Sequence, residues 1–308
     1  MHIETLQMFC NVARRQSFSR GALESNVTQS AASQAIRLLE EYLGVRLFDR
    51  SKRPLGLTPE GERFYRACRE LLEGFDRARA ELSRHQRRIA GTIRVAAIYS
   101  VGLHAMGARM QNFRMVHPEA RVRLECLHPE EGVQAVLDDS VDVGVLSYPP
   151  ANRALTVVPL QHEPMLLVCP PGHPLARRPR ARLAELAGEP YVHFDGDLAV
   201  RKAVDRAFRQ AGVRPQVVME FDNVESIKQA VSTGTGVSIL PEPARQKELA
   251  LGTLVALPIE GEPIVRPIAL IYRRGKPLNP TIERFIELLR GGEELPAAPA
   301  APPPGMAG

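Results

Sequence analysis

Apolar positions recur at helical spacing in the first part of the chain and divide it into short segments. Residues 3–13 carry one such stripe, and residues 20–25 form a short second helix for which Ser19 is the expected N-cap. A tight turn at residues 26–28 leads into a third helix over residues 28–43, capped by Thr28 and ended by Gly44. Two helices joined by so short a turn predict a helix-turn-helix.

The third helix has two distinct faces. Its apolar stripe consists of Ala32, Ile36, Leu39 and Leu43. Its polar face is short, nearly free of carboxylates until Glu40, and suited to base edges in a DNA groove; the predicted DNA contacts on this helix are Gln29, Ser30, Ser33, Gln34 and Arg37. Taken alone, the same periodicity also fits an ordinary amphipathic helix with a solvated side.

A basic hairpin is predicted directly after this helix. Residues 45–50 read as a strand, residues 51–54 as a turn and residues 55–57 as the return strand. Arg50, Lys52 and Arg53 at the tip would reach phosphates or the adjacent minor groove. A solvated surface hairpin is the alternative, and it is weakened because the basic tip follows the polar helix face.

Thr58 and Pro59 begin a long helix, with threonine as N-cap and proline in the first turn, and Thr58 is added to the predicted DNA contacts. The helix should run to about Arg88. Its narrow apolar stripe comprises Phe64, Cys68, Leu71, Leu72, Phe75, Ala78 and Leu82. A helix this long with so narrow a seam favours pairing with a second copy of the chain over packing on its own domain.

Strands and helices alternate from residue 91 onward. Strands at residues 92–97, 122–126 and 142–146 are separated by a helix from Ser100 past Phe113 and by another at residues 133–137, which predicts parallel βα units. A second set has strands at 165–169, 191–194, 216–221 and 237–240, with helices at 199–210 and 224–231. A last strand at 267–272 and a helix at 281–289 should return to the first set, giving two Rossmann-like lobes.

Charge is distributed unevenly along the chain. Residues 1–90 hold 16 basic and 11 acidic residues, whereas the remaining residues hold 24 of each, so the whole net charge of +5 lies in the first part. This asymmetry indicates a nucleic-acid partner for the N-terminal part. The N-terminal sequence lacks a signal-peptide pattern, and no apolar run approaches the ~20 residues of a membrane helix, which predicts a cytoplasmic protein with no membrane partner.

Motifs of catalysis and metal binding are missing from the sequence. The four cysteines are scattered without a Cys-x-x-Cys pair and are expected to be buried thiols, and the eight histidines show no metal-ligand spacing. No nucleophile elbow, zinc-protease motif or dinucleotide fingerprint occurs, and Gly234 and Gly236 lack the ending of a phosphate loop. We therefore expect no enzyme, no cofactor and no metal.

The run from Leu6 to Gly61 closely resembles the LysR-type transcriptional regulators. The matching pieces are LQMFCNVARRQSFSRGA, TQSAASQAIRLLEEYLGVRLFDR and LGLTPEGERFY, and similar runs occur at residues 171–176 and 234–241, so the resemblance covers about residues 1–291. One departure is that the family often has Ser-x-Gln-Ile in the recognition helix, whereas Ser33-Gln34-Ala35-Ile36 moves the glutamine by one position. The resemblance implies a winged helix-turn-helix, a dimerising linker helix and a periplasmic-binding-protein-like effector domain.

Ligands of open α/β lobes bind at the carboxyl ends of strands, near helix N-termini. The predicted effector contacts, which the resemblance places in these same loops, are Ser100, Val101, His128, Pro129, Tyr148, His193, Phe194, Arg201 and Asn223. Three of them have plain alternatives: Arg201 as a solvated helix charge, His193 as a strand-end histidine bonded to backbone, and Asn223 as a helix cap.

The predicted fold class is α+β overall, with a winged helix-turn-helix at 1–58, a dimerising linker helix at 59–90 and an effector-binding domain at 91–291. Lobe I comprises about 91–162 and 265–291, lobe II about 163–264, and residues 292–308 form a Pro- and Ala-rich disordered tail. Expected partners are a promoter dyad in double-stranded DNA, a small-molecule effector with an anionic one as a candidate, and further copies in a homodimer or homotetramer. RNA polymerase is a further candidate. The rival functions are a solute-binding protein and a DNA-associated structural protein without sequence preference.

Overall fold

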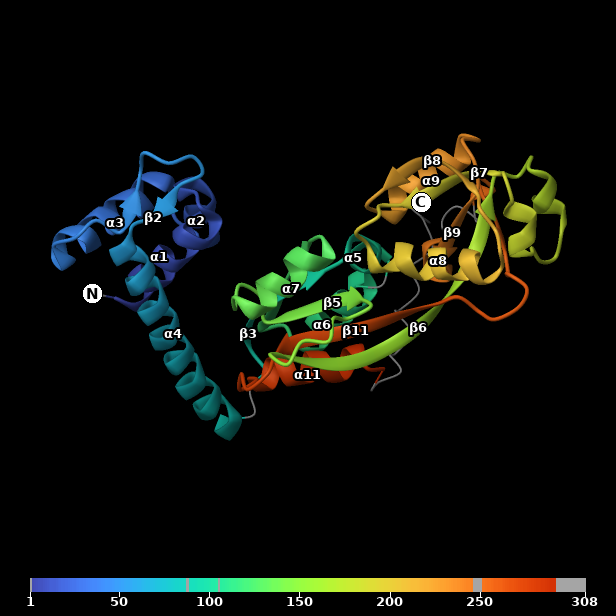
Figure 1. Ribbon diagram of the computed structural model, residues 1–308. Coiled ribbons are helices and arrows are strands. Elements are labelled where there is room, and N and C mark those ends of the chain that lie inside the picture. Colours follow the sequence, from blue (N-terminus) through green and yellow to red (C-terminus); the bar gives the residue numbers. More distant parts are fainter. Residues whose placement is uncertain (1, 87–88, 105, 246–250, 292–308) are drawn as a thin grey trace, which may run out of the picture. The chain divides into compact units, whose positions relative to one another are not determined.

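A computed structural model describes residues 2–86, 89–104, 106–245 and 251–291. The chain divides into two compact units, Met1–Arg87 and Arg88–Gly308, which are considered separately below. Figure 1 shows the elements of each unit. The predicted disordered tail at 292–308 lies outside the described residues.

The first unit is a winged helix-turn-helix followed by a long helix. Its elements are α1 (Ile3–Arg15), α2 (Phe18–Glu24), α3 (Gln29–Leu43), β1 (Phe48–Asp49), β2 (Gly56–Leu57) and α4 (Pro59–Gln86). Phe9 lies at the centre of the core, where its ring packs against Phe48 and Phe64 at centroid distances of 5.4 and 5.2 Å. Ile36 from the apolar stripe of α3 is fully buried beside them.

The helix caps explain where these helices begin and end. The Thr28 hydroxyl accepts a hydrogen bond from the Ala31 N–H, and Gly44 ends α3 in the left-handed region at φ 68°, as predicted. The prediction of Ser19 as the cap of α2 is wrong. Ser17 caps this helix, because its backbone is extended and its hydroxyl accepts from the Arg20 N–H.

The wing strands are shorter than predicted. They pair antiparallel over only two residues each, with Phe48 opposite Leu57. At the start of β1, the N–H groups of Leu47 and Phe48 donate to the Glu40 carboxylate on α3, at 2.8 and 3.1 Å. A side chain of α3 therefore fixes this helix to the wing, beside a strand ladder of only two residue pairs.

The second unit contains one large sheet and one small sheet. The large sheet has the order β10-β6-β11-β5-β3-β4, with β9 also pairing with β6, and the small sheet is β7-β8. The strands are β3 (Gly91–Ala97), β4 (Ala120–Cys126), β5 (Val143–Ser147), β6 (Leu155–Cys169), β7 (Pro190–Phe194), β8 (Gln216–Phe221), β9 (Ser238–Pro241), β10 (Val255–Leu257) and β11 (Val265–Arg273). The predicted parallel pairing is confirmed for β3 with β4 and β5, and for β7 with β8.

Helices flank both sheets. They are α5 (Tyr99–His104), α6 (Met106–Val116), α7 (Pro129–Leu137), α8 (Ala199–Gln210), α9 (Val224–Ser232) and α11 (Pro280–Leu289), with short 3-10 helices at Pro174–Arg177, Leu183–Leu186 and Glu242–Arg245. The helix predicted from Ser100 past Phe113 corresponds to α5 and α6, and residue 105 between them lies outside the described residues. The bounds of α8 and β8 agree with the prediction.

Two separate apolar cores divide the second unit into lobes. One core lies among β3, β5, α6, α7 and α11 in lobe I, and the other among β7, β9, α8 and α9 in lobe II. The antiparallel strands β6 and β11 run side by side from lobe I into lobe II (Figure 1). Each lobe thus has its own core, and the two are joined through this strand pair.

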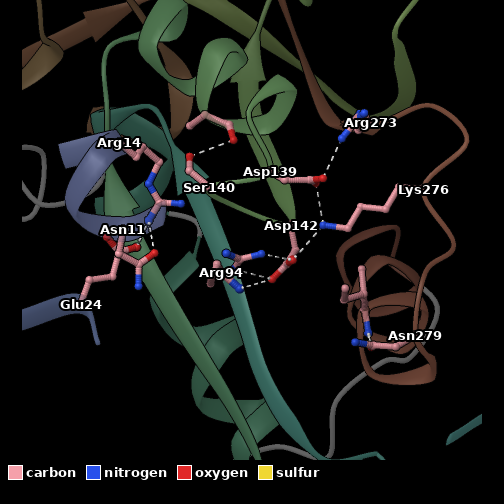
Figure 2. A network of polar contacts seen from close by, with 12 residues as sticks. Asn11, Arg14, Glu24, Arg94, Asp139, Ser140, Asp142, Arg273, Lys276 and Asn279 are labelled. Carbon is pink, nitrogen blue, oxygen red and sulfur yellow. Dashed lines mark hydrogen bonds and ion pairs between the residues drawn. The ribbon is translucent and has the colours of Figure 1, made fainter. Parts of the chain in front are cut away.

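An ion-pair network fixes the start of β5 in lobe I (Figure 2). The Asp142 carboxylate accepts hydrogen bonds from the backbone and guanidinium of Arg94 and from the Lys276 ammonium group. Lys276 and Arg273 also bind Asp139. Burial alone would raise the pKa of Asp142, but the two cations hold it at about 2.

Candidate functional site

The polar face of α3 is presented to solvent. Gln29, Ser30, Gln34 and Arg37 are exposed and Ser33 is half-buried, whereas the apolar stripe of the helix faces the core. Arg37 makes only a loose pair with Glu41 at 3.4 Å, and about two thirds of its side chain is exposed. These side chains are therefore free to meet an external partner.

The three predicted wing cations lie in different surroundings. Arg50 stands over the Phe18 ring at 5.3 Å and reaches Glu40 at 3.3 Å, so it is held against the unit. Lys52 pairs with Asp49 at 3.6 Å, while Arg53 is exposed and has no ion-pair partner within the described residues. Arg53 is the cation of this hairpin best placed to meet a phosphate.

Thr58 connects the wing to α4. Its hydroxyl donates to the Arg46 carbonyl oxygen at 2.7 Å and accepts from the Gly61 N–H at 3.0 Å. Its backbone N–H donates to the Leu47 carbonyl oxygen at 3.0 Å. Both hydrogen-bonding functions of the hydroxyl are used inside the unit, which makes Thr58 primarily a structural residue.

The apolar stripe of α4 faces two ways. Phe64, Cys68 and Leu72 pack into the core of the first unit. Leu71 and Phe75, four positions apart on the helix, are 63% and 46% exposed. An exposed leucine and phenylalanine on one face of a helix form a candidate surface for another copy of the chain.

A cleft lies between the two lobes of the second unit. It encloses about 460 Å³, counting the part that is open to solvent. Five of the predicted effector residues line it: Ser100, His128, Pro129, Phe194 and Asn223. They come from strand ends and helix N-termini of both lobes, so the topology brings together side chains that are distant in sequence.

A buried arginine that the sequence did not indicate also lines this cleft. Arg266 in β11 is only 3% exposed and is opposite Glu163 of β6 in the strand register. Its guanidinium donates to the Glu163 carboxylate and, at 2.9 Å, to the Ser100 hydroxyl. Glu163 also accepts from the Gln161 amide at 2.8 Å. Burial lowers the pKa of Arg266, and Glu163 opposes that effect.

Among the described residues that line the cleft, four of the predicted effector residues are missing. Val101 is buried in the core of lobe I. Tyr148 donates its hydroxyl to the Val265 carbonyl oxygen at 3.1 Å, and burial raises its pKa. Arg201 is bound to Asp205 and Glu220, and His193 contacts the same Asp205 carboxylate.

His193 and Arg201 belong to a polar network of lobe II. His193 is 1% exposed; its Nε2 lies 3.0 Å from Asp205, and its Nδ1 accepts the Phe194 N–H. Arg201 binds the other oxygen of Asp205 at 2.9 Å and Glu220 at 2.6 Å. His193 is therefore a strand-end histidine bonded to backbone, which was the alternative prediction for it. Arg201 is ion-paired, so it is not a solvated charge, and it does not line this cleft.

The lobe II side of the cleft is acidic. Asp222 lines the cleft, and Asp195 and Asp197 lie close by. Burial and the neighbouring carboxylates of Asp197 and Asp222 raise the pKa of Asp195. His128 of lobe I faces this group, with its Nε2 3.5 Å from Asp197.

The described residues contain no cluster of three or more histidine, cysteine, aspartate or glutamate side chains arranged to hold a metal ion. They also contain no helix with the length and apolar character needed to cross a membrane.

Two family models together match nearly the whole described chain. The model for the bacterial regulatory helix-turn-helix protein of the lysR family matches residues 3–62. The model for the LysR substrate binding domain matches residues 86–293. These two segments contain the exposed α3 face and the interlobe cleft, respectively.

Full-length relatives and structures agree with these matches. A RuBisCO operon transcriptional regulator from Allochromatium vinosum is 31% identical over 291 residues, covering 94% of this chain and 96% of the relative. The regulator CbbR of Rhodospirillum rubrum is 29% identical, covering 94% and 96%.

Two solved structures share the fold. Full-length OxyR from Pseudomonas aeruginosa aligns with a TM-score of 0.70 at 24% identity, over 94% of each chain. Full-length CbnR in complex with its target DNA aligns with a TM-score of 0.63 at 22% identity, over 95% of this chain and 100% of that one. Together with the family models and the relatives, these likenesses show that the chain belongs to the LysR family of bacterial transcription regulators.

Proposed function

We propose that this regulator recognises a promoter dyad as a dimer, and that a small molecule in the interlobe cleft changes how it binds or bends that DNA. The observation that carries the DNA part is the exposed polar face of α3 beside the basic wing. The observation that carries the effector part is the cleft with a buried arginine at its wall.

On the DNA, the two elements have different roles. Gln34 and Arg37 supply bidentate groups for base edges in the major groove, and Gln29, Ser30 and Ser33 support them from the first turns of α3. Lys52 and Arg53 contact phosphates or the adjacent minor groove. Arg50, held against Phe18 and Glu40, orients the wing beside the backbone.

A second copy of the chain supplies the other half-site. Leu71 and Phe75 of α4 form the contact between copies, so that two recognition helices enter major grooves one helical turn apart, about 34 Å. Further association into a tetramer would place two such pairs on one promoter. A ligand-dependent change in DNA bend then alters the access of RNA polymerase.

The effector carries an anionic group that meets Arg266. Ser100, His128, Pro129, Phe194 and Asn223 complete the surroundings of that ligand. Because β6 and β11 connect the lobes and carry Glu163 and Arg266, a ligand bound at Arg266 acts directly on the connection between the lobes.

The test begins with selection of a binding site from a random duplex library by the full-length protein. Arg37→Ala is expected to relax specificity at one base position per half-site, by roughly 1–3 kcal/mol. Arg53→Ala is the matched control on the wing: it should weaken all duplexes alike and lower the slope of log affinity against log salt by about one.

Two outcomes would contradict the proposal. If the wild-type protein does not distinguish the selected dyad from random duplex at moderate salt, it is a DNA-associated protein without sequence preference. If it binds no duplex at all, a solute-binding function becomes the better account.

A further inference from the structure

We propose that the cleft takes a zwitterionic ligand of the amino-acid class, with its carboxylate on Arg266 and Ser100 and its ammonium group at Asp222. This inference rests on the proposed effector function and names the chemistry of the effector.

Arg266 has hydrogen-bond donors to spare in the cleft. A guanidinium carries five N–H groups. Within the described residues, two N–H groups of Arg266 donate to Glu163 and one donates to Ser100. Two N–H groups of this guanidinium are left without a partner there. The arginine is 3% exposed, so water has little access to these donors, and a ligand carboxylate would satisfy them.

Ser100 adds a donor beside them. Its hydroxyl oxygen accepts the Arg266 N–H at 2.9 Å, so its own proton is available to a ligand oxygen. Ser100 is 8% exposed and lines the cleft. The two side chains together form a compact donor set for one carboxylate.

The net charge around the cleft argues against a ligand that is only anionic. Glu163 already neutralises Arg266, since both side chains are 4% exposed and ion-paired. The other carboxylate on the lining is that of Asp222, with Asp195 and Asp197 nearby and the His128 imidazole facing Asp197. A second or third negative charge on the ligand would meet repulsion there, whereas an ammonium group would be attracted.

Asp222 is suitably placed to receive that ammonium group. One of its oxygens accepts a hydrogen bond from the Asn223 amide at 2.7 Å, which orients the carboxylate and leaves the other oxygen for a ligand. Asn223 in turn is fixed as the N-cap of α9 by accepting the Ser226 N–H.

Apolar side chains form a further part of the wall. Leu127 of lobe I and Phe194 and Leu198 of lobe II line the same cleft. A ligand held at its two charged ends would therefore place an uncharged, apolar portion against these side chains, which favours amino acids with aliphatic or aromatic side chains.

The test uses full-length protein and matched probe series. The proteinogenic amino acids are screened by thermal shift and isothermal titration calorimetry. Any amino acid that binds is then compared with its deaminated acid and its decarboxylated amine, such as leucine with 4-methylpentanoate and 3-methylbutylamine. We expect at least one apolar amino acid to bind, and at least a tenfold loss of affinity when either charged group is removed.

Variants locate the two ends of the ligand. Asp222→Asn should weaken binding of the amino acid at least tenfold and leave the weak binding of its deaminated acid unchanged or improved. Ser100→Ala should weaken both carboxylate probes. Glu262→Gln, a change at an exposed acidic residue that does not line the cleft, is the control and should have no effect.

The inference is overturned if no amino acid binds, if the deaminated acid binds as tightly as the amino acid, or if Asp222→Asn leaves amino-acid affinity unchanged. Succinate and glucose 6-phosphate are included as probes without an ammonium group. They separate a failure of the amino-acid inference from a failure of the proposed effector function. If either binds and alters the DNA footprint while amino acids do not, the cleft remains an effector site and only the zwitterion is wrong.

Discussion

At the residue scale, His193 shows how the fold fixes a protonation state. Its Nδ1 accepts the Phe194 N–H, so the proton of the neutral ring lies on Nε2, which donates to Asp205. A second proton would have to displace the Phe194 N–H from Nδ1. Burial and the nearby Arg201 guanidinium lower the pKa of His193 to about 4, although Asp205 and Glu220 oppose this.

This lowered pKa predicts an acid-labile lobe II. The unfolded chain binds a proton at His193 near pH 6.5 and the folded chain only near pH 4, so stability is complete above pH 6.5 and decreases as the pH falls to 4. The loss across that window amounts to about 3 kcal/mol. His193→Gln, which keeps a donor for Asp205 but cannot titrate, should flatten the dependence in urea unfolding followed by circular dichroism. The exposed His162→Gln should not. An unchanged pH profile in His193→Gln would refute this account.

At the element scale, the junction of wing and α4 depends on one hydroxyl. Thr58 ties the Arg46 carbonyl to the first turn of α4, and a Cβ atom at Gly61 would stand 2.0 Å from the Leu47 carbonyl oxygen, so the two elements are in close contact. Thr58→Ala should cost about 1–2 kcal/mol of unfolding free energy, while Thr58→Ser should be nearly neutral.

DNA affinity separates this structural role from a direct contact. If Thr58 acts through the fold, Thr58→Ala should lower both the melting temperature of the first unit and its affinity for duplex DNA, and Thr58→Ser should preserve both. A Thr58→Ala protein with normal stability and reduced DNA affinity would instead make this hydroxyl a DNA contact.

Local sequence patterns predicted most elements, and the failures have physical reasons. Ser17 and Ser19 are both good caps, and only the extended backbone at Ser17 decides between them. The first part of β6 was not predicted, because Pro159 and Pro164 interrupt the strand pattern. In the structure the register with β11 shifts between Ile268 and Ala269, next to the position where Pro159 lies opposite Ala269.

The candidate site was predictable only where its residues closely follow the ends of strands. Ser100, His128 and Asn223 follow strands, and the general rule for α/β lobes places them at the cleft. Arg266 and Glu163 are 103 positions apart and become neighbours only through the β6–β11 register, which no local pattern contains. Of the two carboxylates that bind Arg201, Asp205 lies four positions on in the same helix, a spacing visible in the sequence, whereas Glu220 of β8 becomes a neighbour only through the fold.

At the scale of the whole molecule, the proposed recognition of a promoter dyad depends on two copies acting together. One unit offers a single recognition helix and a few wing cations, and a second half-site raises overall affinity by roughly 100-fold or more without new contacts within either half. The structure offers Leu71 and Phe75 on α4 for this association, since both are exposed while Phe64, Cys68 and Leu72 serve the unit's own core.

Leu71→Glu is therefore expected to separate the copies without unfolding either one. Burying a leucine at an interface contributes on the order of 2 kcal/mol, and a carboxylate there adds a desolvation cost, so dimer dissociation should become at least about 30-fold easier. Sedimentation velocity should show the monomer at micromolar concentration, with an unchanged circular dichroism spectrum and much weaker dyad binding. Leu23→Glu, at a leucine of α2 that is more exposed than Leu71, is the control and should leave association intact. A Leu71→Glu protein that still sediments as the wild-type assembly would mean that the copies associate through another surface.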